Sequence, residues 1–435
     1  MNQDDFNQQL CSFLTAATTP FHAVDQMTAR LKTAGFIRLA DDSQWQLKPG
    51  GRYFLTRNDS SLVAFIAGSD CPPAAGMRII GAHTDSPCLM VKPTPELHSH
   101  GLFQLGVQVY GGALLNPWFD RDLSLAGRVS YLSHQGKLYV ALVDFRAAIA
   151  TIPSLAIHLD REANNSRAIN PQTAIVPVLG QLADEQKLDF RALLQARVQQ
   201  EHPHCEVQQI LDYELSFYDT QPPALIGLHQ EFIASARLDN LLSCFTGLQA
   251  LLQSDGTVSS LLICNDHEEV GSLSTSGAHG PLLASVLNRL AGSHSDYAAL
   301  AERSMIISAD NAHAVHPNFA DRHDENHGPR LNSGPVIKVN ASQRYATNSE
   351  TSGFFRMLAA LEEVPVQSFV VRNDMACGST VGPITAGVTG IRTLDIGVPT
   401  LGMHSIRELA GARDAWNLSR ILRRFCNHAG PLCAG

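Results

Sequence analysis

Seven side chains in the sequence are of the types that bind divalent metal ions, and they stand in short polar segments. They are His83, Asp85, Asp239, Glu268, Glu269, Asp310 and His404. Imidazole and carboxylate ligands together suit zinc, cobalt or manganese, and a bridging carboxylate can hold two such ions about 3.5–4 Å apart. Five ligands, one of them bridging, are enough for a pair of ions, so a two-metal site is the leading hypothesis.

The adjacent carboxylates of Glu268 and Glu269 are the most informative pair of this set. Two neighbouring carboxylates at the end of an apolar strand repel each other unless a cation or a proton relieves them. The other residues are weaker signals singly, because a histidine at a strand end can be an ordinary polar residue. Asp239, just before an apolar helical segment, could equally be a helix N-cap.

Four short apolar segments, each followed directly by a polar loop, are expected to position these side chains. They are Met77–Ile80, Leu261–Cys264, Met305–Ser308 and Thr393–Ile396. Buried parallel strands would end at one edge of a sheet, which is where open α/β sheets bind ligands. Apolar residues at helical spacing predict helices at Phe6–Leu14, Ala23–Ala34 and Leu241–Leu252. The alternation predicts an α/β fold with a doubly wound, mainly parallel sheet.

The length of 435 residues exceeds what one hydrophobic core usually supports. Residues 95–231 differ from the rest because they contain β-rich segments at Phe103–Tyr110, Leu125–Leu132 and Leu138–Phe145, separated by turn residues. We therefore expect a catalytic domain formed by residues 1–94 and 232–435, and an inserted β-rich domain formed by residues 95–231.

The composition excludes several classes of protein. A net charge of −9 disfavours a general nucleic-acid-binding or anionic-membrane-binding surface. The N-terminal segment lacks the basic and apolar regions of a signal peptide, and no apolar run approaches the roughly 18–20 residues of a spanning helix, so a cytoplasmic protein is expected. The nine cysteines are scattered without a CxxC pair, which disfavours a disulfide framework.

Five motifs of this sequence resemble those of the aspartyl aminopeptidase family, in the same order and spread over nearly the whole chain. They are Gly81–Cys88, Ala236–Asn240, Asp266–Ser272, Ala309–Asn318 and Gly402–Ser405. The sequence departs from the family pattern at His267, where the family often has Asn or another polar residue. The resemblance implies a metalloaminopeptidase that hydrolyses N-terminal Asp or Glu from peptides.

The resemblance also implies a role for each member of the metal-binding set. Asp239 would bridge two divalent ions, most simply zinc, with cobalt or manganese as alternatives. His83 and Asp310 would complete one site, and Glu269 and His404 would complete the other. Glu268 would be the general base that takes a proton from the attacking water and delivers it to the leaving amine. Asp85 would hold the His83 imidazole in the tautomer that binds metal.

Three further residues are candidates for substrate binding. By resemblance, Lys338 would face the acidic side chain of the substrate, and its cation in the apolar segment Val336–Val339 also requires an anionic partner if it is buried. Tyr345 would donate to the substrate carbonyl or oxyanion. His158, in the inserted domain, would reach the active site of a neighbouring subunit. The inserted domain would then mediate dimerisation, with dimers assembled into a homo-oligomeric dodecamer.

Two alternative functions remain open from the residues alone. The same metal site could serve a metal-dependent deacylase of small amino-acid amides, and the fold could also persist as a non-catalytic oligomeric shell. Lys338 favours the acidic peptide over the small amide, and the presence of every proposed ligand together with Glu268 disfavours the shell.

Overall fold

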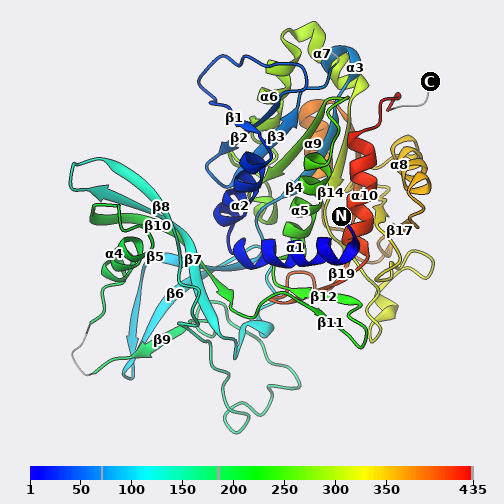
Figure 1. Ribbon diagram of the computed structural model, residues 1–435. Coiled ribbons are helices and arrows are strands. Elements are labelled where there is room, and N and C mark those ends of the chain that lie inside the picture. Colours follow the sequence, from blue (N-terminus) through cyan, green and yellow to red (C-terminus); the bar gives the residue numbers. More distant parts are fainter. Residues whose placement is uncertain (70–71, 184–186, 433–435) are drawn as a thin grey trace. The chain divides into compact units, whose positions relative to one another are not determined.

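The computed structural model describes residues 1–69, 72–183 and 187–432 (Figure 1). The chain divides into two compact units. The first unit comprises Met1–Asp85, Pro223–Met403 and the segment from Glu408 onward, and the second comprises Ser86–Pro222 together with His404–Arg407. The sequence-based boundaries at 94/95 and 231/232 thus differ from the observed ones, because β5 (Cys88–Ser99) already belongs to the sheet of the second unit.

A nine-stranded sheet forms the centre of the first unit, in the order β1-β2-β3-β13-β4-β14-β18-β16-β17. Its strands are β1 (Ile37–Arg38), β2 (Arg52–Arg57), β3 (Ser61–Ile66), β13 (Ser260–Asn265), β4 (Arg78–His83), β14 (Met305–Ala309), β18 (Arg392–Gly397), β16 (Val336–Lys338) and β17 (Gln367–Phe369). The four consecutive strands β13, β4, β14 and β18 are mutually parallel, and all four were predicted from the sequence. Their carboxyl ends therefore lie at one edge of the sheet.

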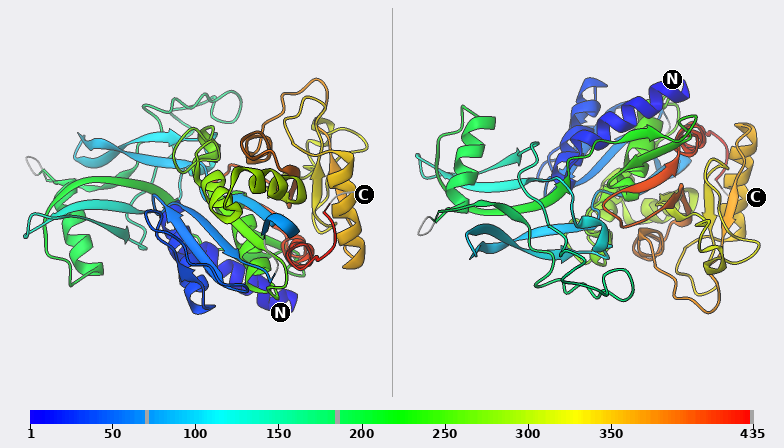
Figure 2. Two further views of the ribbon diagram at one scale, coloured as in Figure 1. Left: turned by 90° about the horizontal axis from the view of Figure 1, so that it is seen from above. Right: turned by 90° about the horizontal axis from the view of Figure 1, so that it is seen from below.

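Helices cover both faces of this sheet (Figures 1 and 2). Along β13, Leu262 and Cys264 pack against one set of helices, whereas Leu261 and Ile263 pack against another. The first set is α1 (Gln3–Ala16), α2 (Pro20–Thr33), α5 (Leu238–Leu252), α8 (Ser349–Leu361) and α10 (Asp414–Cys426). The second set includes α6 (Leu282–Ala291) and α7 (His294–Arg303). Helix α9 (Val381–Thr389) packs on α6, β14 and β18. This arrangement is the predicted doubly wound α/β fold.

Helix α5 is the most deeply buried of these helices, and it carries one of the metal-ligand candidates. Every residue from Leu238 to Leu251 is buried, as expected for a helix that is apolar on nearly all sides. Gly247 allows the close approach of α5 to the sheet, because a Cβ there would lie 2.8 Å from Leu262 and 3.0 Å from Ile80. The tight packing fixes the start of α5 relative to the ends of β4 and β13.

A smaller five-stranded sheet also belongs to the first unit, in the order β11-β12-β20-β19-β15. Its strands are β11 (Ala224–Ile226), β12 (Phe232–Ser235), β20 (Glu408–Gly411), β19 (Pro399–Leu401) and β15 (Ala312–His313). The sequence analysis did not predict this sheet, since its strands are only two to four residues long.

The second unit is built on a six-stranded antiparallel sheet with its own hydrophobic core. The sheet order is β8 (Leu138–Asp144), β7 (Leu123–Ser133), β10 (Val207–Asp219), β5, β6 (Leu102–Tyr110) and β9 (Val178–Gln181). Helix α4 (Phe190–Glu201) packs into this core through Phe190, Leu194 and Val198. The β-rich character predicted for the inserted region is therefore observed.

The remaining short elements are α3 (Pro72–Ala75) and the 3₁₀ turns η1 (Asn116–Trp118), η2 (Glu268–Val270) and η3 (Ala320–Arg322). Seven cysteines in the described part of the chain are free thiols, and Cys244, Cys264 and Cys426 are fully buried. Cys71 and Cys433 lie outside the described residues. Among the helices of the described ranges, none is long and apolar enough to cross a membrane.

Candidate metal centre

The metal-ligand candidates of the first unit lie where the central parallel strands end. His83 is the last residue of β4 and pairs in register with Asn265, the last residue of β13. Turn η2, which carries Glu268 and Glu269, follows β13 after two residues, and Asp310 follows β14 directly. The shared edge explains how ligands far apart in the sequence come together.

His83, Asp239 and Asp310 form the most buried group of ligand atoms. The His83 Nε2 atom lies 3.4 Å from Asp239 Oδ1 and 3.5 Å from Asp310 Oδ1. All three residues are less than one-tenth exposed. An imidazole nitrogen that faces two carboxylates in a buried site is a donor set that zinc accepts.

Glu268 and Glu269 extend this group on the side of η2. One ligand atom from each of His83, Glu268 and Glu269 lies within 4.8 Å of the others, as do the ligand atoms of His83, Asp239 and Asp310. Since His83 belongs to both groups, five of the predicted residues cluster around His83 in the first unit. The donor set fits more than one divalent cation on chemical grounds.

The electrostatics of the cluster show an excess of negative charge. Burial, followed by the carboxylates of Asp310, Asp239 and Asp85, raises the pKa of Glu268 to about 7. Burial and Asp239 raise the pKa of Glu269 further, to about 10. Carboxylates crowded in this way take up protons unless cations are bound, and a metal ion would relieve the same repulsion.

For two other residues of the cluster, hydrogen bonds and nearby charges outweigh the effect of burial on the pKa. Burial disfavours the charged form of His83, but hydrogen bonds to Asp239, Asp310 and Asp85 outweigh it and raise the pKa of His83 well above its usual value. Burial also opposes ionisation of Asp310, yet the ammonium group of Lys338 and the imidazole of His83 hold the pKa of Asp310 below its usual range.

Asp85 connects His83 with the glutamate pair. Its Oδ1 atom lies 3.3 Å from His83 Nδ1, whereas the other ring nitrogen, Nε2, faces Asp239 and Asp310. The same carboxylate accepts hydrogen bonds from the backbone N–H groups of Glu268 and Glu269, each at 3.1 Å. Asp85 can therefore orient the imidazole and fix the position of η2 at the same time.

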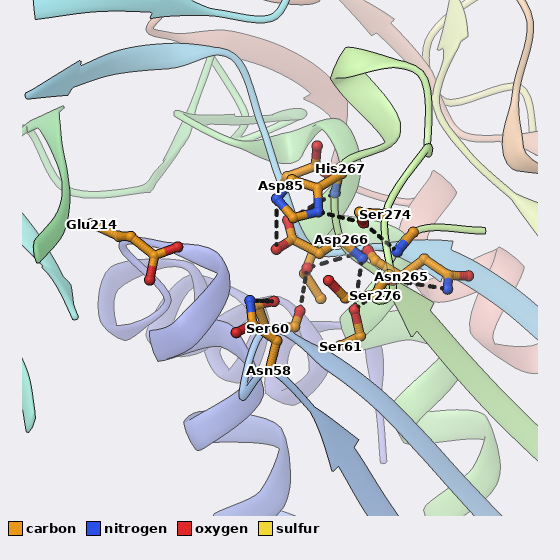
Figure 3. A network of polar contacts seen from close by, with 12 residues as sticks. Asn58, Ser60, Ser61, Asp85, Glu214, Asn265, Asp266, His267, Ser274 and Ser276 are labelled. Atoms are coloured by element: carbon orange, nitrogen blue, oxygen red, sulfur yellow. Dashed lines mark hydrogen bonds and ion pairs between the residues drawn. The ribbon is translucent and has the colours of Figure 1, made fainter. Parts of the chain in front are cut away.

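A second polar network holds the two residues that precede η2 (Figure 3). The backbone N–H of Asp266 donates to Ser61 Oγ at 2.9 Å, and the backbone N–H of His267 donates to Asp266 Oδ1 at 2.8 Å. His267 Nδ1 lies 2.8 Å from Ser274 Oγ. His267 has a φ of 64°, in the left-handed region where Asn and His are both enriched, which explains why His can stand where the family often has Asn.

Asp239 is held from the smaller sheet by a residue that the sequence analysis missed. Its backbone N–H donates to Glu408 Oε2 at 3.0 Å, and its peptide bond to Asn240 is cis. Glu408 is only 2% exposed and opens β20. A single glutamate at the start of the apolar stretch Glu408–Gly411 was the available signal, because an ionised side chain in such a strand needs a specific partner.

Lys338 and Tyr345 also belong to the first unit. Lys338 is 2% exposed, and its ammonium group donates to Asp310 Oδ2 at 3.2 Å and to the carbonyl oxygen of Asn311 at 3.0 Å. Its Nζ atom lies 5.3 Å from the centroid of the Tyr345 ring. The structure thus brings Lys338 to a candidate metal ligand, a contact that the sequence analysis did not predict.

His158 and His404 belong to the second unit. His158 is exposed in a turn, and His404 Nδ1 lies 3.2 Å from the carbonyl oxygen of Gly112. Their roles in the site remain predictions.

The family of the chain follows from comparison with known proteins. The family described as "Aminopeptidase I zinc metalloprotease (M18)" matches residues 13–426. This chain belongs to the M18 family of zinc metalloproteases. It is an aminopeptidase and hence a peptide hydrolase, which confirms the recognised family and the predicted type of enzyme.

Curated M18 relatives match almost the whole chain. A "Probable M18 family aminopeptidase 2" of Pseudomonas putida (strain GB-1) is 59% identical over 423 residues, which cover 97% of this chain and 98% of that protein. The protein of the same name from Pseudomonas fluorescens (strain Pf0-1) is 58% identical with the same coverage.

Solved M18 structures confirm the fold class. The cryo-EM structure of the Ape4 and Nbr1 complex contains a chain that matches with a TM-score of 0.94 and 39% identity, covering 98% of this chain and 86% of that chain. The S. cerevisiae mApe1 dodecamer matches with a TM-score of 0.85 and 28% identity, covering 99% of this chain and 98% of that chain.

The crowded carboxylates predict how the stability of the metal-free M18 enzyme depends on pH. Glu268 and Glu269 have raised pKa values in the folded state, so the folded protein binds more protons than the unfolded chain above about pH 4.5. The free energy of unfolding should therefore fall as the pH rises from 5 to 8, and the raised pKa of His83 acts in the same direction above about pH 6.5. Thermal unfolding of chelator-treated protein at several pH values measures this slope.

The metal-loaded enzyme supplies the comparison. Metal binding displaces protons from these ligands, so the affinity for metal rises with pH and should flatten or reverse the decline in stability. A Glu268→Gln/Glu269→Gln double variant should show a smaller decline when metal-free. Equal slopes with and without metal would contradict the assignment of these residues to a cation site.

Proposed function

We propose that this M18 aminopeptidase removes an N-terminal Asp or Glu from peptides and that each subunit uses two divalent metal ions, most simply zinc. The observation that carries the proposal is the position of Lys338, which places a buried cation against Asp310 of the ligand cluster. A cation beside the metal centre provides a natural partner for an acidic substrate side chain. Cobalt or manganese could replace zinc in the same donor set.

The ligands divide between two ions as the family resemblance implies. Asp239 would bridge the ions, His83 and Asp310 would complete one site, and Glu269 and His404 would complete the other. The short distances from His83 Nε2 to Asp239 and Asp310 support the first site. The proximity of Glu269 to His83 and Glu268 supports the placement of a second ion next to the first.

Glu268 is the residue proposed as general base. When bound, the metal ions polarise the scissile carbonyl and make water easier to deprotonate. Glu268 accepts the proton of the attacking water and passes it to the leaving nitrogen. Its position beside His83 and Glu269, among the candidate ligands, supports this assignment.

Lys338 and Tyr345 are proposed to bind the substrate. An ammonium group has three N–H donors, and Asp310 and Asn311 take two of those of Lys338, which leaves the third for a substrate carboxylate. Burial and a hydrogen bond with Cys377 raise the pKa of Tyr345, so its hydroxyl stays protonated and can donate to the substrate carbonyl.

The working form is proposed to be a homo-oligomer. The similarity to the mApe1 dodecamer, over nearly the full length of both chains, supports dimers assembled into a dodecamer. In that assembly the second unit would mediate dimerisation, and His158 would contribute to the active site of a neighbouring subunit.

Hydrolysis of aminoacyl p-nitroanilides by metal-stripped enzyme tests the proposal. We expect no cleavage without metal, and cleavage of Asp- and Glu-p-nitroanilide but little cleavage of the Ala and Leu substrates after addition of Zn²⁺, Co²⁺ or Mn²⁺. Metal-restored cleavage that is equally good for Ala and Leu would retain the peptidase and refute the acidic specificity. Activity only on small N-acyl amino acids would favour the deacylase alternative.

A further inference from the structure

Asp395 is a fully buried carboxylate that the candidate metal centre does not include. It lies on β18, where its neighbours Leu394 and Ile396 pack into the core on the α5 side of the sheet. Because side chains alternate along a strand, Asp395 projects from the opposite face. Its exposed fraction is 0%, so its polar partners must come from the protein.

The two carboxylate oxygens of Asp395 join two segments that are distant in the sequence. The backbone N–H of Ala346 donates to Oδ2 at 2.6 Å, and the Thr380 hydroxyl donates to Oδ1 at 2.7 Å. A separate bond runs from the backbone N–H of Asp395 to Thr347 Oγ1 at 3.0 Å. Residues 346–347 are therefore attached to β18 both through the side chain and through the backbone of Asp395.

The absence of a side chain at Gly382 makes room for this carboxylate at the start of α9. A Cβ atom on Gly382 would lie 2.2 Å from Asp395 Oδ1 and 2.3 Å from Oδ2, distances that no real contact allows. Gly382 is the second residue of α9, and the N-terminal turn of a helix favours a negative charge. The carboxylate thus anchors residue 346 to a fixed point in the fold.

The hydrogen bond at Ala346 acts on the residue before it. The Ala346 N–H belongs to the peptide group that links it to Tyr345, so this bond fixes the orientation of the Tyr345 backbone. The Tyr345 ring is 5% exposed and lies beside the Lys338 ammonium. The charge of Asp395 also acts on Lys338, since the two groups interact electrostatically.

We propose that Asp395 is a positioning residue for substrate recognition, which holds Tyr345 against Lys338 through the hydrogen bond to Ala346. This inference rests on the proposed function, because it assigns to Asp395 the geometry of the pocket that reads the acidic side chain. Asp395 itself does not touch the substrate. A purely structural role would affect stability without changing the preference among substrates.

The decisive readout is a ratio: kcat/KM for Asp-p-nitroanilide divided by kcat/KM for Ala-p-nitroanilide, measured on the metal-loaded enzyme. It is independent of the fraction of folded enzyme, so partial unfolding of a variant does not obscure it. Asp395→Ala removes both acceptors, and we expect the ratio to fall about tenfold or more, chiefly through a higher KM for the acidic substrate.

Asp395→Asn is the conservative variant that should rescue the ratio. Its amide oxygen can still accept from Ala346, while its NH₂ group donates to the Thr380 hydroxyl, which can act as an acceptor. We expect the ratio to return to within about threefold of the wild type, because only the charge is lost while the hydrogen bonds remain.

Thr347→Val is the matched control, because it breaks the bond to the Asp395 backbone in the same segment but leaves the carboxylate bonds intact. It should lower the melting temperature and leave the ratio unchanged. If Asp395→Ala yields no folded protein, Asp395→Ser, whose hydroxyl is too short to reach Ala346, should show the same fall.

The possible results separate the two proposals. An unchanged ratio in the variant that folds, or an equal fall in Thr347→Val, would overturn the positioning role. A wild-type enzyme without any acidic preference would instead overturn the proposed function before the variants are compared.

Discussion

Replacing Glu268 by glutamine is expected to lower kcat by about 10²–10⁴-fold, the usual contribution of a general base, while the enzyme still folds and binds its metal ions. Glutamine has nearly the same shape but cannot accept the proton of the attacking water. Glu268 lies within the group of candidate ligand atoms that also includes His83 and Glu269, which supports a role for it next to the attacking water. The backbone bond from its N–H to Asp85 does not depend on the side chain, so η2 should keep its conformation.

Turnover of Asp-p-nitroanilide measures the loss of kcat in Glu268→Gln. Mass spectrometry of the purified protein measures whether the variant still binds its metal ions. Glu269→Gln should lower the metal content as well as the turnover, because Glu269 is proposed as a ligand rather than as the base. Glu325→Gln, the same change at an exposed position, should behave like the wild type. Full activity in Glu268→Gln would remove Glu268 from the mechanism.

The cluster of candidate metal ligands was largely predictable because most of its members stand at strand ends. A short apolar run followed by a polar loop is a local pattern, and the parallel arrangement of β13, β4, β14 and β18 is the usual outcome of alternating strands and helices. These two facts suffice to predict that His83, Glu268, Glu269 and Asp310 meet at one edge. The structure brings all four together in the first unit.

The contacts of the supporting residues were not predictable, because each contact is made with a distant segment. Glu408 reaches Asp239 from a strand of four residues that no periodicity marks. Asp395 stands inside a predicted strand, where nothing local shows that its oxygens meet Ala346 and Thr380. Such contacts depend on the packing of the whole first unit, whereas the ligands depend on local patterns.

The same reasoning explains the difference in the domain boundary. From the sequence, residues up to 94 were assigned to the first part of the catalytic domain. The structure places Cys88–Ser99 in β5, whose partners β6 and β10 supply most of its hydrogen bonds. The sheet that a strand joins depends on its partner strands. For β5, the partner β10 lies more than one hundred residues further along the chain.

Lys338 is the residue for which the structure changes the interpretation most. From the sequence, Lys338 was expected to face the substrate, yet its ammonium already donates to Asp310 Oδ2. Two roles are therefore to be separated: recognition of the acidic side chain, and neutralisation of a metal ligand. The ion pair between Lys338 Nζ and Asp310 Oδ2, at 3.2 Å, is present without substrate, so Lys338 already neutralises this candidate ligand.

Lys338→Met removes the charge but keeps most of the volume of the side chain, and it is expected to separate these roles. If Lys338 binds the substrate carboxylate, kcat/KM for Asp- and Glu-p-nitroanilide should fall about 100-fold or more, because truncating one member of a buried charge pair typically costs about 2–5 kcal/mol. The Ala substrate, which has no side-chain carboxylate, should lose less than about tenfold. Lys32→Met, at an exposed position of α2, is the matched control and should change neither value.

The opposite pattern would assign Lys338 to the metal centre alone. In that case activity on the acidic and neutral substrates should fall by the same factor, and excess Zn²⁺ should restore part of both, because Asp310, without the hydrogen bond that holds its carboxylate in place, would bind metal less tightly. Measuring the metal dependence of both substrates in Lys338→Met therefore distinguishes a residue that selects the substrate from one that holds the ligand. Since Asp310 and the substrate carboxylate would use different N–H donors of one ammonium group, we expect the acidic substrates to lose most and added metal to recover little of that loss.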